Sequence, residues 1–398
     1  MICISCSKCR FTHTVLEINF LIVNSYRASA NNIQGEPNIP ESQIGAHSCL
    51  HRRAELHIED VAFGGSGVAR SGGKIVFVPL TIDGEEVEVQ IVEQKKKFDC
   101  AELRKVLRSS AERVEPPCPY FGSCGGCDYQ HITYKHQLEL KRRQVSELLK
   151  RVGHLSDVSV SPVVPCRNPY AFRNRITVHA EHGRIGFFAK NSRNVVDVKR
   201  CAIAVPEVNE KLKQLRKEGL RDGSHRTLRG EGVPLTFTQT NSFVASELLE
   251  YISVRLEGKV LLDAYCGSGF FGHALAGRFQ KIVGLDWNEH AIFRAKAFAE
   301  SNELYICADV AEAIVAILGE HNPQAVLLDP PAAGIEKLVV EALAANKPER
   351  LIYISCNPAT LARDLSRLCE HLEVKSVQPF DMFPQTAEIE TVVVMDRR

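Results

Sequence analysis

Five short apolar segments alternate with helix-period segments from about residue 236 to the end of the chain, and each ends in a glycine-containing or polar loop. The segments are KVLLDAYCGSG, KIVGLD, LYICAD, AVLLDPP and RLIYISC. Short buried strands that alternate with helices predict a parallel, doubly wound sheet. Ligands of such sheets bind at the carboxyl ends of the strands, so we expect the functional residues there.

The first two of these strand ends suggest a nucleoside-containing cofactor. Glycines in the loop Asp263–Gly269 allow the backbone to approach a ligand before the next helix begins. Asp286 ends the following strand, 17 residues after Gly269, where a carboxylate can bind a ribose diol. A nicotinamide cofactor is the alternative, but GSGFFG lacks the full GxGxxG fingerprint. The loop looks more like that of an S-adenosylmethionine (SAM) methyltransferase, which would place Asp309 near the adenine.

Two later strand ends carry reactive side chains. Asp329 precedes two prolines that stiffen its loop, so we expect its carboxylate to point into the cleft. Cys356 ends a strand immediately before a helix, where the dipole and the free amides lower the pKa of a thiol. Inert packing is the common role of a single strand-end cysteine. The neighbouring loops favour a nucleophile instead.

The N-terminal part of the chain has a different pattern. Residues 53–113 alternate apolar and polar positions between glycine-rich turns, and Val87, Val89 and Ile91 fall on one face of an expected strand. Several short strands predict a small β-barrel of the type that binds oligonucleotides, although a barrel can also serve as a spacer. Residues 1–52 have the composition of a loop or a disordered segment.

The chain contains 14 cysteines, which are too scattered for a disulfide framework. Most are expected to be small buried hydrophobes. The stretch CPYFGSCGGCDYQH is different, because it packs Cys118, Cys124 and Cys127 into ten residues with glycines between them. The residues alone do not assign these thiols a role.

Charge and hydropathy indicate the kind of partner and the cellular location. The net charge of +1 hides basic clusters at residues 95–108 and 167–200, which fit a polyanion partner but are also typical of solvated surfaces. No apolar run approaches the roughly 18 to 20 residues that a membrane span requires. We therefore expect a cytoplasmic protein without a membrane segment, and a monomer by default.

Residues 53–398 resemble the RNA uracil-5-methyltransferases, particularly the iron–sulfur-containing branch that modifies 23S ribosomal RNA. The resemblance is carried by FTQTN, DAYCGSG, LLDPP, SCNPATLARD and DMFPQTAEIE, in the order and approximate spacing of the family. It implies an α/β chain with a Rossmann-like class I methyltransferase domain at 236–398. It also implies an OB-like, RNA-binding TRAM barrel at 53–113 and a central α+β iron–sulfur domain at 114–235.

The resemblance gives the clustered cysteines a role. The family's pattern adds a distant fourth cysteine, here Cys201 in DVKRCAIAVPEVN. With Cys118, Cys124 and Cys127 it would hold one [4Fe–4S] cluster, and zinc is the alternative because four-cysteine sites are also common for that metal. The methyl transfer requires no electron, so the cluster would be structural or would position the RNA.

The resemblance also implies a mechanism. Because carbon 5 of uracil is a poor nucleophile, the Cys356 thiolate would add to carbon 6, and the resulting enolate would attack the methyl group of SAM. Glu390 would remove the carbon 5 proton as general base. The target uridine would be flipped out or unpaired. The implied cofactor contacts are Gln239, Tyr265, Asp286 and Asp329, and candidates for holding phosphates are Arg173 and Arg175.

Four positions depart from the family's pattern. Ala332 follows DPP where the family often has arginine, and Phe270 stands where asparagine is common. Gln385 and Glu388 stand where many members have histidine. Since the nucleophile and the base are retained, we predict SAM-dependent methylation of carbon 5 of a uridine in 23S rRNA. The alternatives are the same reaction on tRNA and a noncatalytic RNA-binding or redox protein of the same fold.

Overall fold

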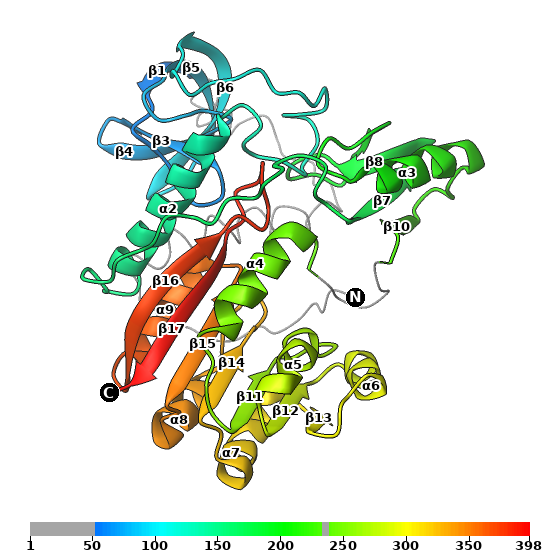
Figure 1. The fold of residues 1–398 in the computed structure, drawn as a ribbon. Coiled ribbons are helices and arrows are strands. Elements are labelled where there is room, and N and C mark those ends of the chain that lie inside the picture. The colour runs from blue at the N-terminus through cyan, green and yellow to red at the C-terminus, as the bar shows by residue number, and fades with distance from the viewer. Residues whose placement is uncertain (1–51, 233–238) are drawn as a thin grey trace, which may run out of the picture.

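The computed structural model describes residues 52–232 and 239–398, which form three β-sheets with helices packed against them (Figure 1). The barrel strands (blue to cyan) and a smaller sheet (green) lie above a large sheet that ends in red strands in this view. The predicted extension 1–52, apart from its last residue, lies outside the described residues, and so do the first two residues of FTQTN.

The first sheet has six strands in the order β1-β5-β6-β4-β3-β2. Val87, Val89 and Ile91 are buried, which confirms the predicted one-sided strand. The β5–β6 register shifts at three places, and such irregularities bend a strand and help a sheet to curl. The strands are β1 Arg53–His57, β2 Asp60–Val61, β3 Ser66–Ser71, β4 Lys74–Pro79, β5 Glu86–Gln94 and β6 Phe98–Arg108.

Helix α2 (Tyr134–Arg151) follows the barrel and packs against the large sheet and helix α9 (Pro358–Leu368) (Figure 1). Its Val145, Leu148 and Leu149 belong to the same apolar cluster as the residues of that sheet. The second sheet comes next, in the order β10-β7-β8-β9, with helix α3 packed on one face. Its elements are β7 Arg175–Glu181, β8 Arg184–Phe188, β9 Val195–Asp197, α3 Pro206–Glu218 and β10 His225–Arg229.

The third sheet has seven strands in the order β13-β12-β11-β14-β15-β17-β16. Strands β11 to β15 are parallel, and they coincide with the five apolar segments of the sequence. Strand β17 is antiparallel to its neighbours β15 and β16. The strands are β11 Val260–Ala264, β12 Lys281–Asp286, β13 Glu303–Cys307, β14 Ala325–Leu328, β15 Arg350–Ser355, β16 Leu372–Phe380 and β17 Glu390–Arg397.

Helices cover both faces of this sheet, as a doubly wound fold requires. One apolar cluster joins the sheet to α7, α8 and α9, and another joins it to α4 and α5. No helix in 52–232 or 239–398 has the length and hydropathy needed to cross a bilayer. The helices are α4 Ser242–Ser253, α5 Phe270–Leu275, the 3₁₀ turn η2 Ala276–Arg278, α6 Glu289–Ala297, α7 Val310–His321, α8 Lys337–Asn346 and α9 Pro358–Leu368.

Candidate active site

The strand order reverses between β11 and β14, because the chain runs outward to β13 and then returns to the other side of β11. In a parallel sheet this reversal opens a crevice at the carboxyl ends of the strands. Asp286 ends β12, and Asp329 and Cys356 directly follow β14 and β15. The topology therefore brings these predicted residues to one edge of the sheet.

The glycine-containing loop is fixed by Asp286. Its Oδ2 accepts a hydrogen bond from the Gly267 amide at 2.9 Å, and its Oδ1 accepts one from Asn288 at 2.8 Å. Gly267 has φ +54° and Gly269 has φ +82°, conformations that favour glycine. Beneath the loop, Asp263 is fully buried and accepts a hydrogen bond from the Gly272 amide. Burial raises the pKa of Asp263 to about 8.

The other predicted cofactor residues lie around this loop in different settings. Tyr265 follows β11 with φ +63°, and its hydroxyl donates to Glu336 at 3.0 Å. Asp309 caps helix α7 by accepting from the first amides of that helix. Gln239 lines a cavity of about 550 Å³ together with Phe270, the first residue of the helix that follows the loop.

Cys356 and Glu390 stand opposite each other at neighbouring strand ends. The antiparallel register of β15 and β17 pairs Ser355 with Thr391. Cys356 follows Ser355 and Glu390 precedes Thr391, so the two residues come next to each other at this end of the sheet. Burial raises the pKa of the Cys356 thiol to about 12, and the negative charges of Glu390 and Asp329 contribute to the rise. The predicted lowering of this pKa by the helix N-terminus is therefore wrong.

Acidic side chains gather around this thiol. Burial raises the pKa of Asp329 to about 7, and burial together with the charges of Asp329 and Glu388 raises the pKa of Glu390 well above its usual range. Each carboxylate disfavours ionisation of the others. Such a site favours a cationic ligand, and it keeps a carboxyl group able to accept or donate a proton near neutral pH.

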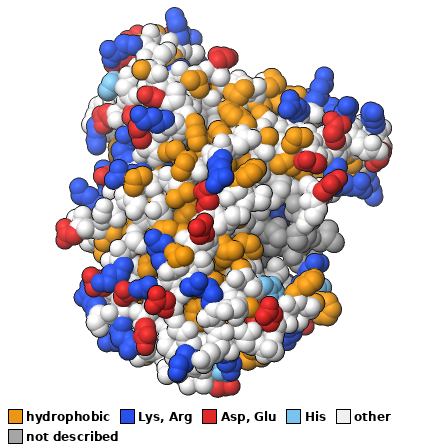
Figure 2. Space-filling model, in the orientation of Figure 1, with side chains coloured by type: hydrophobic (Ala, Val, Ile, Leu, Met, Phe, Trp, Pro, Cys, Tyr) orange, Lys and Arg blue, Asp and Glu red, His pale blue; other side chains and the backbone are white. Residues whose placement is uncertain are grey.

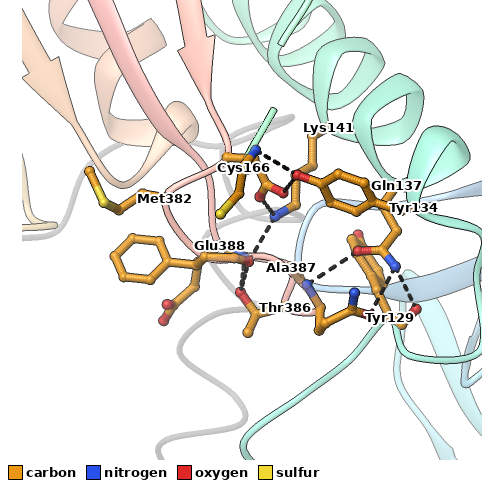
Figure 3. Close-up of polar contacts among 12 residues, drawn as sticks. Tyr129, Tyr134, Gln137, Lys141, Cys166, Met382, Thr386, Ala387 and Glu388 are labelled. Atoms are coloured by element: carbon orange, nitrogen blue, oxygen red, sulfur yellow. Dashed lines mark hydrogen bonds and ion pairs between the residues drawn. The ribbon is translucent and has the colours of Figure 1, made fainter. Parts of the chain in front are cut away.

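The segment from Asp381 to Glu390 is held by helix α2 (Figure 3). Lys141 Nζ donates to Asp381 Oδ1 at 2.6 Å, and both side chains are completely buried. The Tyr134 hydroxyl donates to the other carboxylate oxygen at 2.7 Å. The side chains of Gln137 and Gln385 are joined through Nε2 and Oε1 at 3.0 Å, so Gln385 points toward α2. A buried ion pair fixes the start of the segment that leads to Glu390.

The four predicted metal ligands, Cys118, Cys124, Cys127 and Cys201, line one cavity of about 430 Å³. Burial and the neighbouring thiols of Cys201 and Cys118 raise the pKa of Cys124 to about 11. Within the described ranges, however, no three His, Cys, Asp or Glu side chains form a group that could hold a metal ion as they stand. Arg173 lines the same cavity. Four thiols around one space match the donor set of a metal cluster, although they do not converge.

Comparison with known proteins identifies the family. The family described as tRNA (uracil-5-)-methyltransferase matches residues 312–398, and the TRAM domain family matches residues 48–103. An uncharacterised RNA methyltransferase of Bdellovibrio bacteriovorus is 33% identical over 382 residues, which cover 88% of this chain and 97% of that protein. The chain belongs to the RNA uracil-5-methyltransferase family.

Further relatives agree with this family. An uncharacterised RNA methyltransferase of Protochlamydia amoebophila is 30% identical over 424 residues, covering 86% of this chain and 98% of that protein. The solved structure of the Pyrococcus abyssi tRNA (uracil-54, C5)-methyltransferase in complex with S-adenosyl-L-homocysteine has a TM-score of 0.67 and 27% identity. It covers 85% of this chain, and all of that chain is matched. This uracil-5-methyltransferase is accordingly a SAM-dependent enzyme with a Rossmann-like fold and a TRAM domain, as predicted.

Sequence reasoning missed the residues of this methyltransferase that shape the loop after Asp329. Thr360 Oγ1 and Asn357 Nδ2 both donate to the Ala332 carbonyl, at 3.0 and 3.1 Å. Asp364 is buried and accepts from the Ile335 amide at 3.0 Å and from the Tyr353 hydroxyl at 2.8 Å. The sequence signal that could have pointed to them is a helix that starts after Asn357 and carries Asp364 on an otherwise apolar face. The sequence did not say which loop those side chains would contact.

Proposed function

We propose that this enzyme methylates carbon 5 of a uridine in 23S rRNA through a covalent bond between Cys356 and the uracil ring. The observation that carries the proposal is the position of Cys356 and Glu390 at adjacent strand ends, with Asp329 close enough to affect both pKa values. A nucleophile and a base on neighbouring strands can reach the same pyrimidine ring. Gln239, Tyr265, Asp286, Asp309 and Asp329 are the proposed cofactor contacts.

The proposed reaction follows from these groups. The sulfonium cation of SAM favours the Cys356 thiolate, because a nearby positive charge stabilises an anion among carboxylates. The Cys356 sulfur would add to carbon 6, and the electron pair displaced onto the ring would form the bond between carbon 5 and the methyl group while the methyl–sulfonium bond of SAM breaks and S-adenosyl-L-homocysteine leaves. Glu390 removes the proton from carbon 5, the carbon 6–sulfur bond breaks, and the thiolate is restored.

A trapping experiment tests this mechanism. Fluorine at carbon 5 cannot leave as a proton, so RNA that contains 5-fluorouridine should form a denaturant-stable complex with the enzyme in the presence of SAM. We expect Cys356→Ser to form no complex. Cys307→Ser is the matched control, because Cys307 is exposed at the end of β13. A wild-type enzyme that forms no complex would instead support a noncatalytic RNA-binding protein.

The second sheet, of strands β7 to β10, offers a surface for the RNA. Helix α3 covers one face, and on the other the rings of His179 and Phe188 stack with their centroids 4.0 Å apart, with His225 at 5.8 Å from His179. Arg173 and Arg175 line the adjoining cavity. Stacking rings beside arginines are typical of surfaces that bind unpaired bases and phosphates. Lys and Arg side chains also gather at the outer edges of the barrel and of the second sheet with its helix α3 in Figure 2.

Ribosomal RNA is the proposed substrate, because the four cysteines and the TRAM barrel resemble the ribosomal branch of the family. tRNA is the second candidate, and the likeness to the Pyrococcus tRNA enzyme favours it. Mass spectrometry of 5-methyluridine in separately purified 23S rRNA and tRNA, from cells with and without the gene, distinguishes the two. A deficit confined to tRNA would contradict our choice.

The four cysteines are proposed to hold one [4Fe–4S] cluster. Burial raises the pKa of the Cys124, Cys127 and Cys201 thiols, and a bound metal would favour their deprotonated forms. Such a cluster would tie the segment 118–127 to Cys201. Anaerobically purified protein should be brown and contain about four iron atoms per chain. A colourless protein with stoichiometric zinc would refute iron.

A further inference from the structure

Asp128, which directly follows Cys127, connects the cysteine segment with the segment that leads to Glu390. The amides of Asp128 and Tyr129 both donate to the Gln385 carbonyl, at 2.9 and 3.0 Å. In return, the Ala387 amide donates to Asp128 Oδ2 at 3.1 Å. Three hydrogen bonds therefore hold two loops that lie more than 250 positions apart in the sequence.

The same carboxylate also binds a segment that pairs with the cysteine segment. Asp128 Oδ1 accepts a hydrogen bond from Lys190 Nζ at 2.6 Å. Lys190 adjoins Ala189, whose backbone pairs with Cys124. The Asp128 carboxylate thus joins Lys190, next to the residue that pairs with Cys124, to the Ala387 amide. Because Asp128 directly follows Cys127, a change in the arrangement of the thiols would act on it through the chain.

The junction leaves little room for another arrangement. Gly65 of the barrel approaches it so closely that an added Cβ would lie 3.1 Å from Asp128 and 3.4 Å from Ala387. Gln385, Thr386 and Ala387 are each less than a tenth exposed. Close packing of this kind fixes the backbone that it surrounds.

Only two residues separate Ala387 from Glu390. Because β17 begins at Glu390, we expect a displacement at Ala387 to change where the chain enters the strand and so to move the Glu390 carboxylate. Proton transfer requires the base within hydrogen-bonding reach of the proton, and an error of about 1 Å is costly. The hydrogen bond that holds the Ala387 amide should therefore affect removal of the carbon 5 proton by Glu390.

We propose that Asp128 is a positioning residue that couples the cysteine segment to Glu390, so that the conformation of residues 118–131 controls removal of the carbon 5 proton. The inference rests on the proposed function for the role of Glu390. Asp128 contacts neither RNA nor SAM in this scheme. It acts only through the Ala387 amide and the Gln385 carbonyl.

The test compares Asp128→Ala and Asp128→Asn with the control Asp83→Asn, which alters another partly buried aspartate, located between the barrel and α2. With unmodified RNA and SAM, we expect the Asp128 variants to lose roughly 10- to 100-fold in kcat with KM changed less than about twofold. The methylated enzyme–RNA adduct should accumulate, because its proton is removed slowly. Amide hydrogen exchange at residues 385–389 should be at least about tenfold faster.

Two results would overturn the proposal. One is an Asp128→Asn variant with wild-type kcat and exchange rates. The other is a loss of activity that matches the fraction of unfolded protein, without adduct. The exchange measurement needs no catalysis, so it remains decisive if Cys356→Ser retains turnover, a result that would refute the proposed function instead.

Discussion

At the scale of single residues, Cys356 shows which of two opposing effects on a thiol is larger. A helix N-terminus stabilises an anion by about 0.3–1 kcal/mol, and by about 2 kcal/mol in favourable sites. One pKa unit corresponds to about 1.4 kcal/mol, so this effect lowers a pKa by at most about 1.5 units. Burial can raise it by about 3 to 5 units, and acidic neighbours add to that. Burial and the acidic neighbours therefore outweigh the helix N-terminus, and the pKa of the Cys356 thiol is raised to about 12.

Removal of one acidic neighbour should make the thiol more reactive. Glu390→Gln eliminates a negative charge beside Cys356, so the pKa of the thiol should fall by about one unit. In a Cys307→Ser background, alkylation of Cys356 by iodoacetamide near pH 9 should become roughly three- to tenfold faster. The matched control is Glu373→Gln, which alters an exposed glutamate paired with Lys375. An unchanged alkylation rate would show that Glu390 does not act on the thiol.

At the scale of elements, the start of α9 organises the loop after β14. Asp364, the seventh residue of the helix, accepts from the Ile335 amide, the Tyr353 hydroxyl and the Arg363 guanidinium. Because the carboxylate is buried, no water replaces it when it is removed. The helix that begins next to Cys356 thus also fixes the loop that begins at Asp329.

The variant Asp364→Ala should lower the free energy of unfolding by about 2–4 kcal/mol, because it leaves two buried donors, the Ile335 amide and the Tyr353 hydroxyl, without this acceptor. Urea denaturation followed by circular dichroism measures the change. Asp222→Asn is the control, since Asp222 is exposed and accepts a hydrogen bond from the Gly183 amide; its effect should stay within about 0.5 kcal/mol. Equal stabilities of the two variants would contradict the role assigned to Asp364.

The elements also show how far the sequence could predict this molecule. The buried strands β11 to β15 were evident, because a parallel strand covered on both faces is a continuous apolar run. The topology then placed Asp286, Asp329 and Cys356 at one edge. The position of α2 on the large sheet could not be predicted. The pair of Lys141 with Asp381 joins residues 240 positions apart, and nothing local marks a lysine that will be buried.

At the scale of the whole molecule, the barrel and the catalytic sheet are joined through α2. An apolar cluster at the junction contains Val61 and Ile82 from the barrel, Leu140 from α2 and Ala387 from the segment before Glu390. The barrel, α2 and the segment that leads into β17 therefore share one packed region. A change in the contacts between the barrel and α2, here called barrel docking, should change the free energy of unfolding of the complete chain.

His136 of α2 makes this docking sensitive to pH. Its Nε2 lies 2.8 Å from Asp83 Oδ1 of the barrel, and both side chains are mostly buried. The hydrogen bond to Asp83 raises the pKa of His136. Burial acts to raise the pKa of Asp83, but the bond to His136 and the charge of Arg143 outweigh it and lower that pKa.

The signs of these shifts define the pH range in which the pair stabilises the fold. A raised histidine pKa contributes fully below about pH 6.5 and is lost as the pH rises through the folded pKa. A lowered aspartate pKa contributes above about pH 3.9 and is lost as the pH falls through the folded value. His136→Gln should therefore reduce the free energy of unfolding more at pH 5.5 than at pH 8.5, as urea denaturation at the two pH values would measure. His57→Gln removes a histidine from an exposed pair with Glu86 and should show almost no such difference. If His136→Gln destabilises equally at both pH values, the charge of His136 does not contribute to barrel docking.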